Sequence, residues 1–198
     1  MPRTQGNRAL PALAEVFRLH GFEGASLALI SAATGLGKGS LYNLFPGGKD
    51  EMMNAVLADI DAWFVANVFG PLEDASDPAA AVAATMRAAG TYFRSGGRVC
   101  LVGCVGLTAS RDRFAARVRT YFARWVSALA ACLGSAGLAQ DRAERVAEET
   151  VAAIQGAIVL ARALDDDGVF ARIVARQEAR LASAVGAGLP PRRDEGRP

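Results

Sequence analysis

The sequence contains few of the residues on which metal sites and disulfide frameworks depend. Its 198 residues include three cysteines and one histidine. Cys100, Cys104 and Cys132 are an odd number and too few for a disulfide framework. His20 lies ~80 residues from the nearest cysteine and shares no ligand spacing with it, so we expect no metal site and no cofactor. We interpret His20 as a helix-end residue.

The side chains that enzymes combine for catalysis are also scarce. A single histidine weakens any histidine-based scheme, and we find no nucleophile–base or paired-carboxylate arrangement. The acid cluster Asp165-Asp166-Asp167 precedes a glycine, and we interpret it as a solvated turn and helix cap. An enzyme is therefore the weaker hypothesis; turnover of a substrate without DNA affinity would favour it.

Long hydrophobic runs are missing as well. No apolar run reaches the ~18–20 residues of a membrane-spanning helix, and the start lacks the basic-then-apolar pattern of a signal peptide. Hydrophobic residues make up 52% of the chain and charged residues 21%, which is enough to form a core and argues against wholesale disorder. We expect a cytoplasmic protein without a membrane partner.

The small excess of positive charge lies at one end of the chain. The net charge is +2, and residues 1–50 carry all of it, because basic and acidic side chains balance in the remainder. Lys38 and Lys49, the only lysines, both fall in this segment. Such an excess indicates an anionic partner only if the local structure directs the charges toward it.

The pattern of apolar residues and Gly/Pro breaks predicts an all-α protein. Ser26 is a good N-cap and Gly35 a good C-terminal residue for a short helix that buries Leu27, Ile30 and Ala33. Asp141 and Glu144 resemble a capping box, and residues 70–77 read as a turn. The other expected helices cover approximately residues 8–20, 38–45, 49–69, 78–94, 99–109, 111–133, 141–164 and 169–185.

The two short helices over residues 26–45 carry the most specific signal. Two helices joined by Gly35-Leu36-Gly37 are typical of a helix-turn-helix. On the second helix Leu41, Leu44 and Phe45 share the inner face. The outer face carries no acid and consists of Lys38, Gly39, Ser40, Tyr42 and Asn43.

This outer face suits the major groove of DNA. Gly39 allows close approach of the backbone. Asn43 can pair with a base edge, most naturally adenine, and Lys38 can reach guanine or a phosphate. Tyr42, Ser26 and Lys49 can each hold a phosphate oxygen. A helical hairpin with a glycine corner also occurs in many proteins that do not bind DNA.

The stretch Phe22–Lys49 resembles the DNA-binding domain of TetR-family transcriptional regulators. The matched positions are Gly21-Phe22, Ser26, Ile30, Gly35, Gly39, Leu41-Tyr42, Phe45 and Lys49. The Phe-Pro-Gly-Gly-Lys ending is similar to the LmrA- and YxaF-type branch. Gly37, Thr34 and Leu44 depart from the common pattern, and Leu44 puts a phosphate or packing role of its position in doubt.

The resemblance implies a three-helix DNA-binding domain over residues 1–48 and a larger ligand-binding and dimerisation domain over 49–187. Residues 188–198, rich in Gly, Pro and Arg, are expected to be a disordered tail. A one-component regulator that acts as a repressor is implied: a homodimer on near-palindromic double-stranded DNA, released by a small apolar or aromatic effector. Expected pocket residues are Trp63, Phe64, Met86, Tyr92, Phe93, Cys104, Phe122 and Trp125, although each also suits a core position.

Small residues on the last two long helices favour a close helix–helix contact between two copies of the chain. The predicted interface residues are Ala153, Gly156, Ala157, Leu160, Ile173 and Gln177. A second hypothesis is a redox-responsive regulator, because Cys100 and Cys104 are spaced to share a helix face. Only Arg98 lies near enough in sequence to lower a thiol pKa, so the two cysteines also suit a core role.

Overall fold

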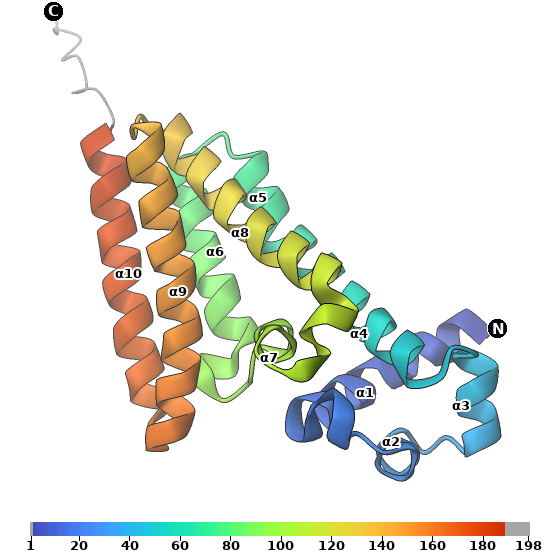
Figure 1. The fold of residues 1–198 in the computed structure, drawn as a ribbon. Helices are drawn as coiled ribbons and strands as arrows, with labels where there is room; N and C mark the ends of the chain where they lie inside the picture. The colour runs from blue at the N-terminus through green and yellow to red at the C-terminus, as the bar shows by residue number, and fades with distance from the viewer. Residues whose placement is uncertain (1, 189–198) are drawn as a thin grey trace, which may run out of the picture. The chain divides into compact units, whose positions relative to one another are not determined.

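The computed structural model describes residues 2–188, which form helices and turns without a β-strand (Figure 1). The expected all-α class is confirmed. The chain divides into two compact units. One comprises the residues up to Ala66 together with Val99–Ala123, and the other comprises Asn67–Arg98 together with the residues from Arg124 onward. The predicted domain boundary at residues 48/49 stays a prediction, and residues 189–198 of the predicted tail lie outside the described part.

The first unit is built around a helix-turn-helix. It contains α1 (Pro2–Gly24), α2 (Leu27–Thr34), α3 (Lys38–Leu44), α4 (Gly48–Phe64), α7 (Leu101–Gly106), the 3₁₀ helix η3 (Ala109–Phe114) and the beginning of α8 (Ala115–Ser135). Helix α1 packs against α2, α4 and α7. The core of the unit includes Leu13, Phe17, Ile30, Leu41 and Met53, all without exposed surface.

Helix α1 is longer than its apolar pattern predicts, since it begins at Pro2 rather than near Arg8. Its regular turns end at Gly21, whose φ of 66° and ψ of 176° interrupt the helix before Gly24. A positive φ costs glycine little because glycine has no Cβ. The expected stop at Gly21 is therefore present, and His20 is exposed beside it.

The second unit is a bundle of longer helices. It contains α5 (Gly70–Glu73), α6 (Pro78–Tyr92), the 3₁₀ helix η2 (Arg94–Gly96), the rest of α8, α9 (Gln140–Leu164) and α10 (Asp167–Gly188). Helix α10 packs against α9, α6 and η2, and α9 and α10 lie side by side (Figure 1). Asp77 caps α6 through Oδ1, which accepts from the N–H of Ala80 at 3.0 Å, and Pro78 takes the first turn.

Two expectations about helix ends were wrong. Residues 70–73 are helical rather than a turn, because the π-helix η1 (Val65–Phe69) carries the helical path from α4 into α5. Asp141 and Glu144 do not form a capping box. Ala139 is the N-cap of α9 without a side-chain cap, while Glu144 accepts from Gln140 at 2.6 Å and Asp141 from Arg145 at 3.0 Å.

Gly96 holds a tight junction between η2 and the last two helices. Its φ is +99°, and a Cβ at this position would lie 2.8 Å from Cβ of Ala161 and 2.9 Å from Cβ of Phe170. Both contacts are shorter than a carbon–carbon contact tolerates. The backbone of η2 therefore approaches α9 and α10 as closely as it does only because residue 96 is glycine.

The stretch Gly48–Glu73 is the one described helical segment with the length and apolar composition of a membrane span. The core helix of a water-exposed protein meets the same test. The α4 part of this stretch buries a continuous face that includes Met52, Val56, Ile60 and Phe64. Its apolar character is thus accounted for by packing inside the fold.

Candidate nucleic-acid interface and ligand cavity

The helix-turn-helix is formed by α2 and α3. Ser26 is the N-cap of α2, where its Oγ accepts from the N–H of Leu29 at 3.2 Å. Gly35 ends the helix in the left-handed region with φ 67°, and its N–H donates to the carbonyl of Ser31. Both predicted ends of this helix are confirmed. Ala33, which was expected to be buried, is exposed, whereas Ile30 is fully buried.

Two hydroxyl groups that the sequence analysis missed fix the turn between the helices. The hydroxyl of Ser31 donates to the carbonyl of Leu36 at 2.7 Å. Thr34 donates from Oγ1 to the carbonyl of Ile30 at 2.7 Å and accepts from the N–H of Leu36 at 3.3 Å. These bonds hold the backbone of Leu36 in the turn to the side chains of the last helical turn of α2. Thr34 thus has a structural use at this departure from the common family pattern.

Helix α3 has a buried face and an outer face, as its sequence predicts. Leu41 and Phe45 are buried, and Leu44 is half-buried. The outer residues Lys38, Gly39, Ser40, Tyr42 and Asn43 are all exposed. A Cβ added to Gly39 would meet no atom within 4 Å, so its backbone is open to a partner. Gly37 begins the helix without a side-chain cap.

Lys49 is held more firmly than a surface lysine. It is half-buried at the start of α4, and its Nζ donates to the carbonyl of Glu23 at 3.3 Å. The same Nζ lies 4.6 Å from the centre of the Phe22 ring. These contacts leave part of the ammonium group for a phosphate and also tie α4 to the end of α1. Lys49 therefore has a structural role that the sequence did not indicate.

The ring of Tyr42, on the outer face of α3, packs beside Gly48. Gly48 has φ +65°, and a Cβ there would lie 3.5 Å from Cε1 of Tyr42. Tyr42 keeps 40% of its surface exposed. The ring is thus supported on one side while the outer side remains available to a partner.

The eight residues expected to line an effector pocket are divided between the two compact units. Trp63, Phe64, Cys104 and Phe122 belong to the first unit, and Met86, Tyr92, Phe93 and Trp125 to the second. Phe64 is fully buried with its ring 4.9 Å from that of Tyr121. Phe93 and Trp125 are also fully buried and stack at 6.5 Å. These three aromatic residues pack as core.

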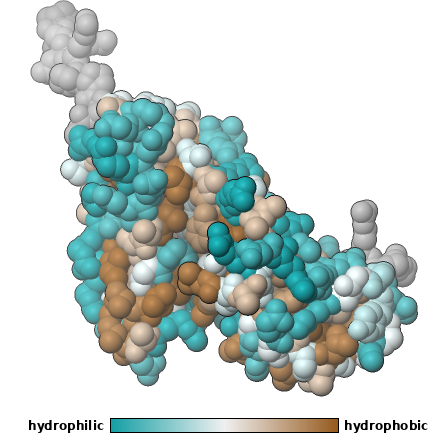
Figure 2. Space-filling model, in the orientation of Figure 1, coloured by the Kyte–Doolittle hydropathy of each residue, from teal (hydrophilic) through white to brown (hydrophobic). Residues whose placement is uncertain are grey.

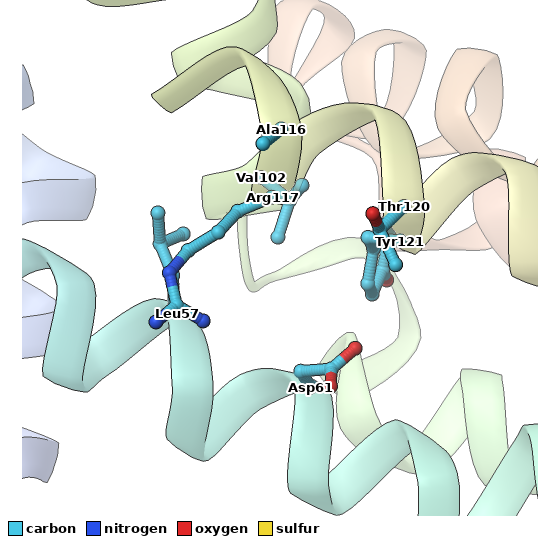
Figure 3. Close-up of a pocket in the computed structure, with 7 residues that line it drawn as sticks. All are labelled: Leu57, Asp61, Val102, Ala116, Arg117, Thr120 and Tyr121. Atoms are coloured by element: carbon cyan, nitrogen blue, oxygen red, sulfur yellow. The ribbon is translucent and has the colours of Figure 1, made fainter. Parts of the chain in front are cut away.

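A cavity of about 200 Å³ lies elsewhere in the first unit, between α4, α7 and α8 (Figure 3). None of the eight expected residues lines it. Its walls are Leu57, Asp61, Val102, Ala116, Arg117, Thr120 and Tyr121. Sequence reasoning passed over this set because it favoured large aromatic residues, whereas the cavity combines small apolar walls with polar side chains one helical turn apart.

The cysteines occupy ordinary structural positions. Cys100 is buried at the N-cap of α7, where its Sγ accepts from the N–H of Gly103 at 3.3 Å. Cys104 is half-buried. Burial raises the pKa of the Cys132 thiol, which disfavours the reactive thiolate. The redox hypothesis for Cys100 and Cys104 gains no support from these positions and stays an untested prediction.

The predicted dimer residues lie on the two last helices with different exposures. Leu160 is exposed, Ala153, Gly156, Ile173 and Gln177 are half-buried, and Ala157 has no exposed surface in the single chain. Helix α9 also exposes the side chains of Val159 and Leu164, each with 62% of its surface accessible to solvent. Figure 2 shows hydrophobic residues gathered over α9 and α10. The interface stays a prediction.

Comparisons with known proteins match both parts of the chain. The family described as bacterial regulatory proteins, tetR family, matches residues 10–56. The family described as transcriptional regulator LmrA/YxaF-like, C-terminal domain, matches residues 78–177.

Individual relatives agree with these matches. The HTH-type transcriptional regulator LmrA of Bacillus subtilis is 26% identical over 157 residues, which cover 77% of this chain and 84% of LmrA. YxaF of the same organism is 25% identical over 158 residues, covering 77% and 82%.

Solved structures show the same fold. A TetR-family regulator from Agrobacterium tumefaciens superposes with a TM-score of 0.75 at 21% identity and covers 91% of this chain and 98% of its own. A CifR cysteine mutant complexed with 26bp double-strand operator DNA gives a TM-score of 0.60 at 23% identity, covering 91% and 93%.

Proposed function

The chain belongs to the TetR family of transcriptional regulators, in its LmrA/YxaF-like branch, and from this premise we propose that it is a repressor that binds a near-palindromic operator as a homodimer. It is a DNA-binding regulator rather than an enzyme. Its proposed location is the cytoplasm, where its DNA partner lies. A small, largely apolar effector would release it from the operator.

The outer face of α3 carries this proposal. Lys38, Gly39, Ser40, Tyr42 and Asn43 are exposed together, and none of them is acidic. Such a face offers hydrogen-bond donors to base edges and phosphates without repelling the backbone of DNA. The CifR mutant, which resembles this chain in fold, was solved with operator DNA, and this supports the proposal that the chain binds an operator.

The homodimer is proposed from the apolar surface of the last two helices. Helix α9 exposes three large apolar side chains, Val159, Leu160 and Leu164. Their burial against a second copy would remove apolar surface from water and so favour association. A two-fold contact through the same patch on each copy would form the dimer, whose two α3 helices would have to lie ~34 Å apart, or somewhat more on an extended site. Matching two successive major grooves requires this spacing.

Release by an effector requires that the effector bind one conformation better than another. An effector that favours a conformation with a different spacing between the two α3 helices would lower operator affinity. The cavity between α4, α7 and α8 is the proposed site, because α4 follows directly on the helix-turn-helix.

The test is binding of the full chain to DNA from immediately upstream of its own gene, followed by selection from genomic fragments. We expect a protected near-palindrome and a steep decrease in affinity with salt. Asn43→Ala should lower operator affinity about tenfold, as expected for the loss of a paired contact to a base edge. Ser127→Ala, exposed on α8, is the control. Binding no tighter than to random DNA in both experiments would refute the proposal.

A further inference from the structure

The cavity between α4, α7 and α8 contains one acidic side chain, Asp61. Leu57, Val102 and Ala116 form its apolar walls. Figure 3 shows Asp61 reaching from α4 toward the side of the cavity where Thr120 and Tyr121 descend from α8, whereas Arg117 extends on the side of Leu57. The cavity therefore has one negative and one positive end within its small volume.

The two charged groups differ in the hydrogen bonds that they form within the protein. Arg117 donates from Nε to Oδ1 of Asn54 at 2.9 Å, and Asn54 in turn donates from Nδ2 to the carbonyl of Asp50 at 3.0 Å. Asp61 forms no hydrogen bond or ion pair with any of the side chains that the structure describes, residues 6–186. Of the two charges, the Asp61 carboxylate is the one without a partner among the described side chains, whereas the Arg117 guanidinium has its Nε taken by Asn54.

The groups around Asp61 define what would satisfy it. An ionised carboxylate only accepts hydrogen bonds, and its strongest partners are charged donors. The hydroxyl of Thr120 lines the same cavity from α8 and can accept a further bond. The Tyr121 ring offers an aromatic surface, which attracts cations and also apolar groups. A donor-bearing cation with an apolar body matches this combination.

We propose that the cavity binds a small organic amine in its protonated form, with the ammonium group on Asp61 and the apolar body against Leu57, Val102 and Ala116. A volume of about 200 Å³ is below the ~300–1,000 Å³ of drug-sized sites, so the ligand is compact. Its role as the effector rests on the function proposed above, whereas its binding does not.

An anionic ligand paired with Arg117 is the competing occupant. It would have to share the guanidinium with Asn54 and would place a second negative charge in a cavity that already holds the Asp61 carboxylate. The repulsion from Asp61 has its counterpart for a cation in the positive Arg117, so the bond that already holds Nε of Arg117 to Asn54 is what favours a cation on Asp61.

The test uses three probes of one shape and different charge: 4-phenylbutylamine, 4-phenylbutan-1-ol and 4-phenylbutanoate. Binding to the full chain is measured by titration calorimetry at pH 7.5 without DNA. The amine should bind at least about tenfold more tightly than the alcohol and the carboxylate, as one charge-assisted hydrogen bond allows.

Asp61→Asn should remove this preference, because it keeps the shape of the side chain and loses its charge. The Kd of the amine should then rise about tenfold, with less than a twofold change for the alcohol. Asp59→Asn is the matched control, since Asp59 is exposed on the same helix and does not line the cavity. It should leave all three affinities unchanged.

Three results would overturn the proposal: no amine binding at millimolar concentration, a preference for the amine that survives Asp61→Asn, or tightest binding by the carboxylate. Operator affinity is measured separately with and without the amine. Amine binding through Asp61 that leaves operator affinity unchanged would keep the site and refute its effector role. Failure to find an operator would leave the calorimetric test intact.

Discussion

Arg117 on α8 donates from Nε to Oδ1 of Asn54 on α4 at 2.9 Å, and one turn earlier on the chain Arg113 pairs with Asp50 at 2.8 Å. The Arg113 guanidinium also lies 5.2 Å from the centre of the Phe22 ring, whose edge-on contact with Phe114 measures 5.2 Å. These contacts join the segment around the start of α8 to the first turns of α4. Since Arg117 also lines the cavity, the same residue touches the proposed ligand site and the helix that follows the DNA-binding segment.

The Arg117–Asn54 bond should be measurable as a pairwise energy. In a double-mutant cycle with Arg117→Met and Asn54→Ala, we expect a coupling of about 0.5–1 kcal/mol in the free energy of unfolding, because Arg117 is exposed to water. Urea denaturation provides the measurement. Arg119→Met, exposed on the same helix, should show no coupling to Asn54→Ala. A coupling of zero for Arg117 as well would mean that the bond does not persist in solution.

The DNA-binding segment was the part most fully predictable from sequence. Ser26 caps a helix, Gly35 ends it in the left-handed region, and Leu41 faces inward on the next short helix. Each of these features depends only on neighbours within a few residues. Local rules of this kind are readable in a sequence. The outer face of α3 follows from the same helical periodicity.

The cavity could not be found in this way. Asp61 and Thr120 are far apart in the chain and line the same cavity only because α4 and α8 lie on opposite sides of it (Figure 3). The aromatic residues favoured for the pocket, such as Phe93 and Trp125, instead fill the core, since large side chains gain most from complete burial. The second role of Lys49, on Phe22 and Glu23, depends equally on tertiary contacts.

Gly96→Ala should destabilise the second unit strongly. The new methyl group would lie 2.8 Å from Cβ of Ala161 and 2.9 Å from Cβ of Phe170, and the φ of +99° disfavours alanine. The expected loss is about 2 kcal/mol or more in the free energy of unfolding. Gly90→Ala inside α6 is the control: its Cβ would meet nothing within 4 Å, and alanine favours a helix by ~0.5–1 kcal/mol. Thermal or urea unfolding should thus give changes of opposite sign, and equal effects would contradict the tight junction.

The Glu73–Arg124 pair predicts a defined dependence of stability on pH. A hydrogen bond from the Arg124 side chain lowers the pKa of Glu73, with Nε to Oε1 and NH2 to Oε2 both at 2.8 Å. Because the folded pKa is the lower one, the stabilisation is complete above the unfolded value of about 4.3 and is lost as the pH falls through the folded value.

The size of this effect is limited by solvent, since both side chains are more than a third exposed. We expect the pair to contribute no more than about 1 kcal/mol. Stability measured by urea unfolding from pH 6 to 3 should fall less steeply in Glu73→Gln than in the unchanged protein. Arg124→Gln should reduce the slope similarly, although it also removes the contact with the Phe69 ring. Parallel pH curves for all three proteins would show that the pair does not form.

Substitution of each lysine should distinguish a residue that only binds DNA, Lys38, from one that binds DNA and also stabilises the fold, Lys49. Lys38 is exposed and forms no hydrogen bond or ion pair within the described part of the chain, so Lys38→Ala should lower operator affinity without changing the free energy of unfolding. Lys49→Ala should weaken operator binding and also cost about 0.5–1.5 kcal/mol of stability, because Nζ is bonded to Glu23 and lies over Phe22. Urea unfolding and DNA titrations monitored by fluorescence anisotropy measure the two effects.

The salt dependence of these titrations identifies what each lysine touches. Loss of one phosphate contact should reduce the slope of log affinity against log salt by about 1 and weaken operator and random DNA alike. If Lys38 instead reads guanine, Lys38→Ala should weaken the operator and leave random DNA nearly unaffected, since only base contacts carry sequence information. Arg119→Ala removes one positive charge from α8 and controls for a general loss of charge. Operator binding that is equally strong in all three variants would remove both lysines from the DNA interface.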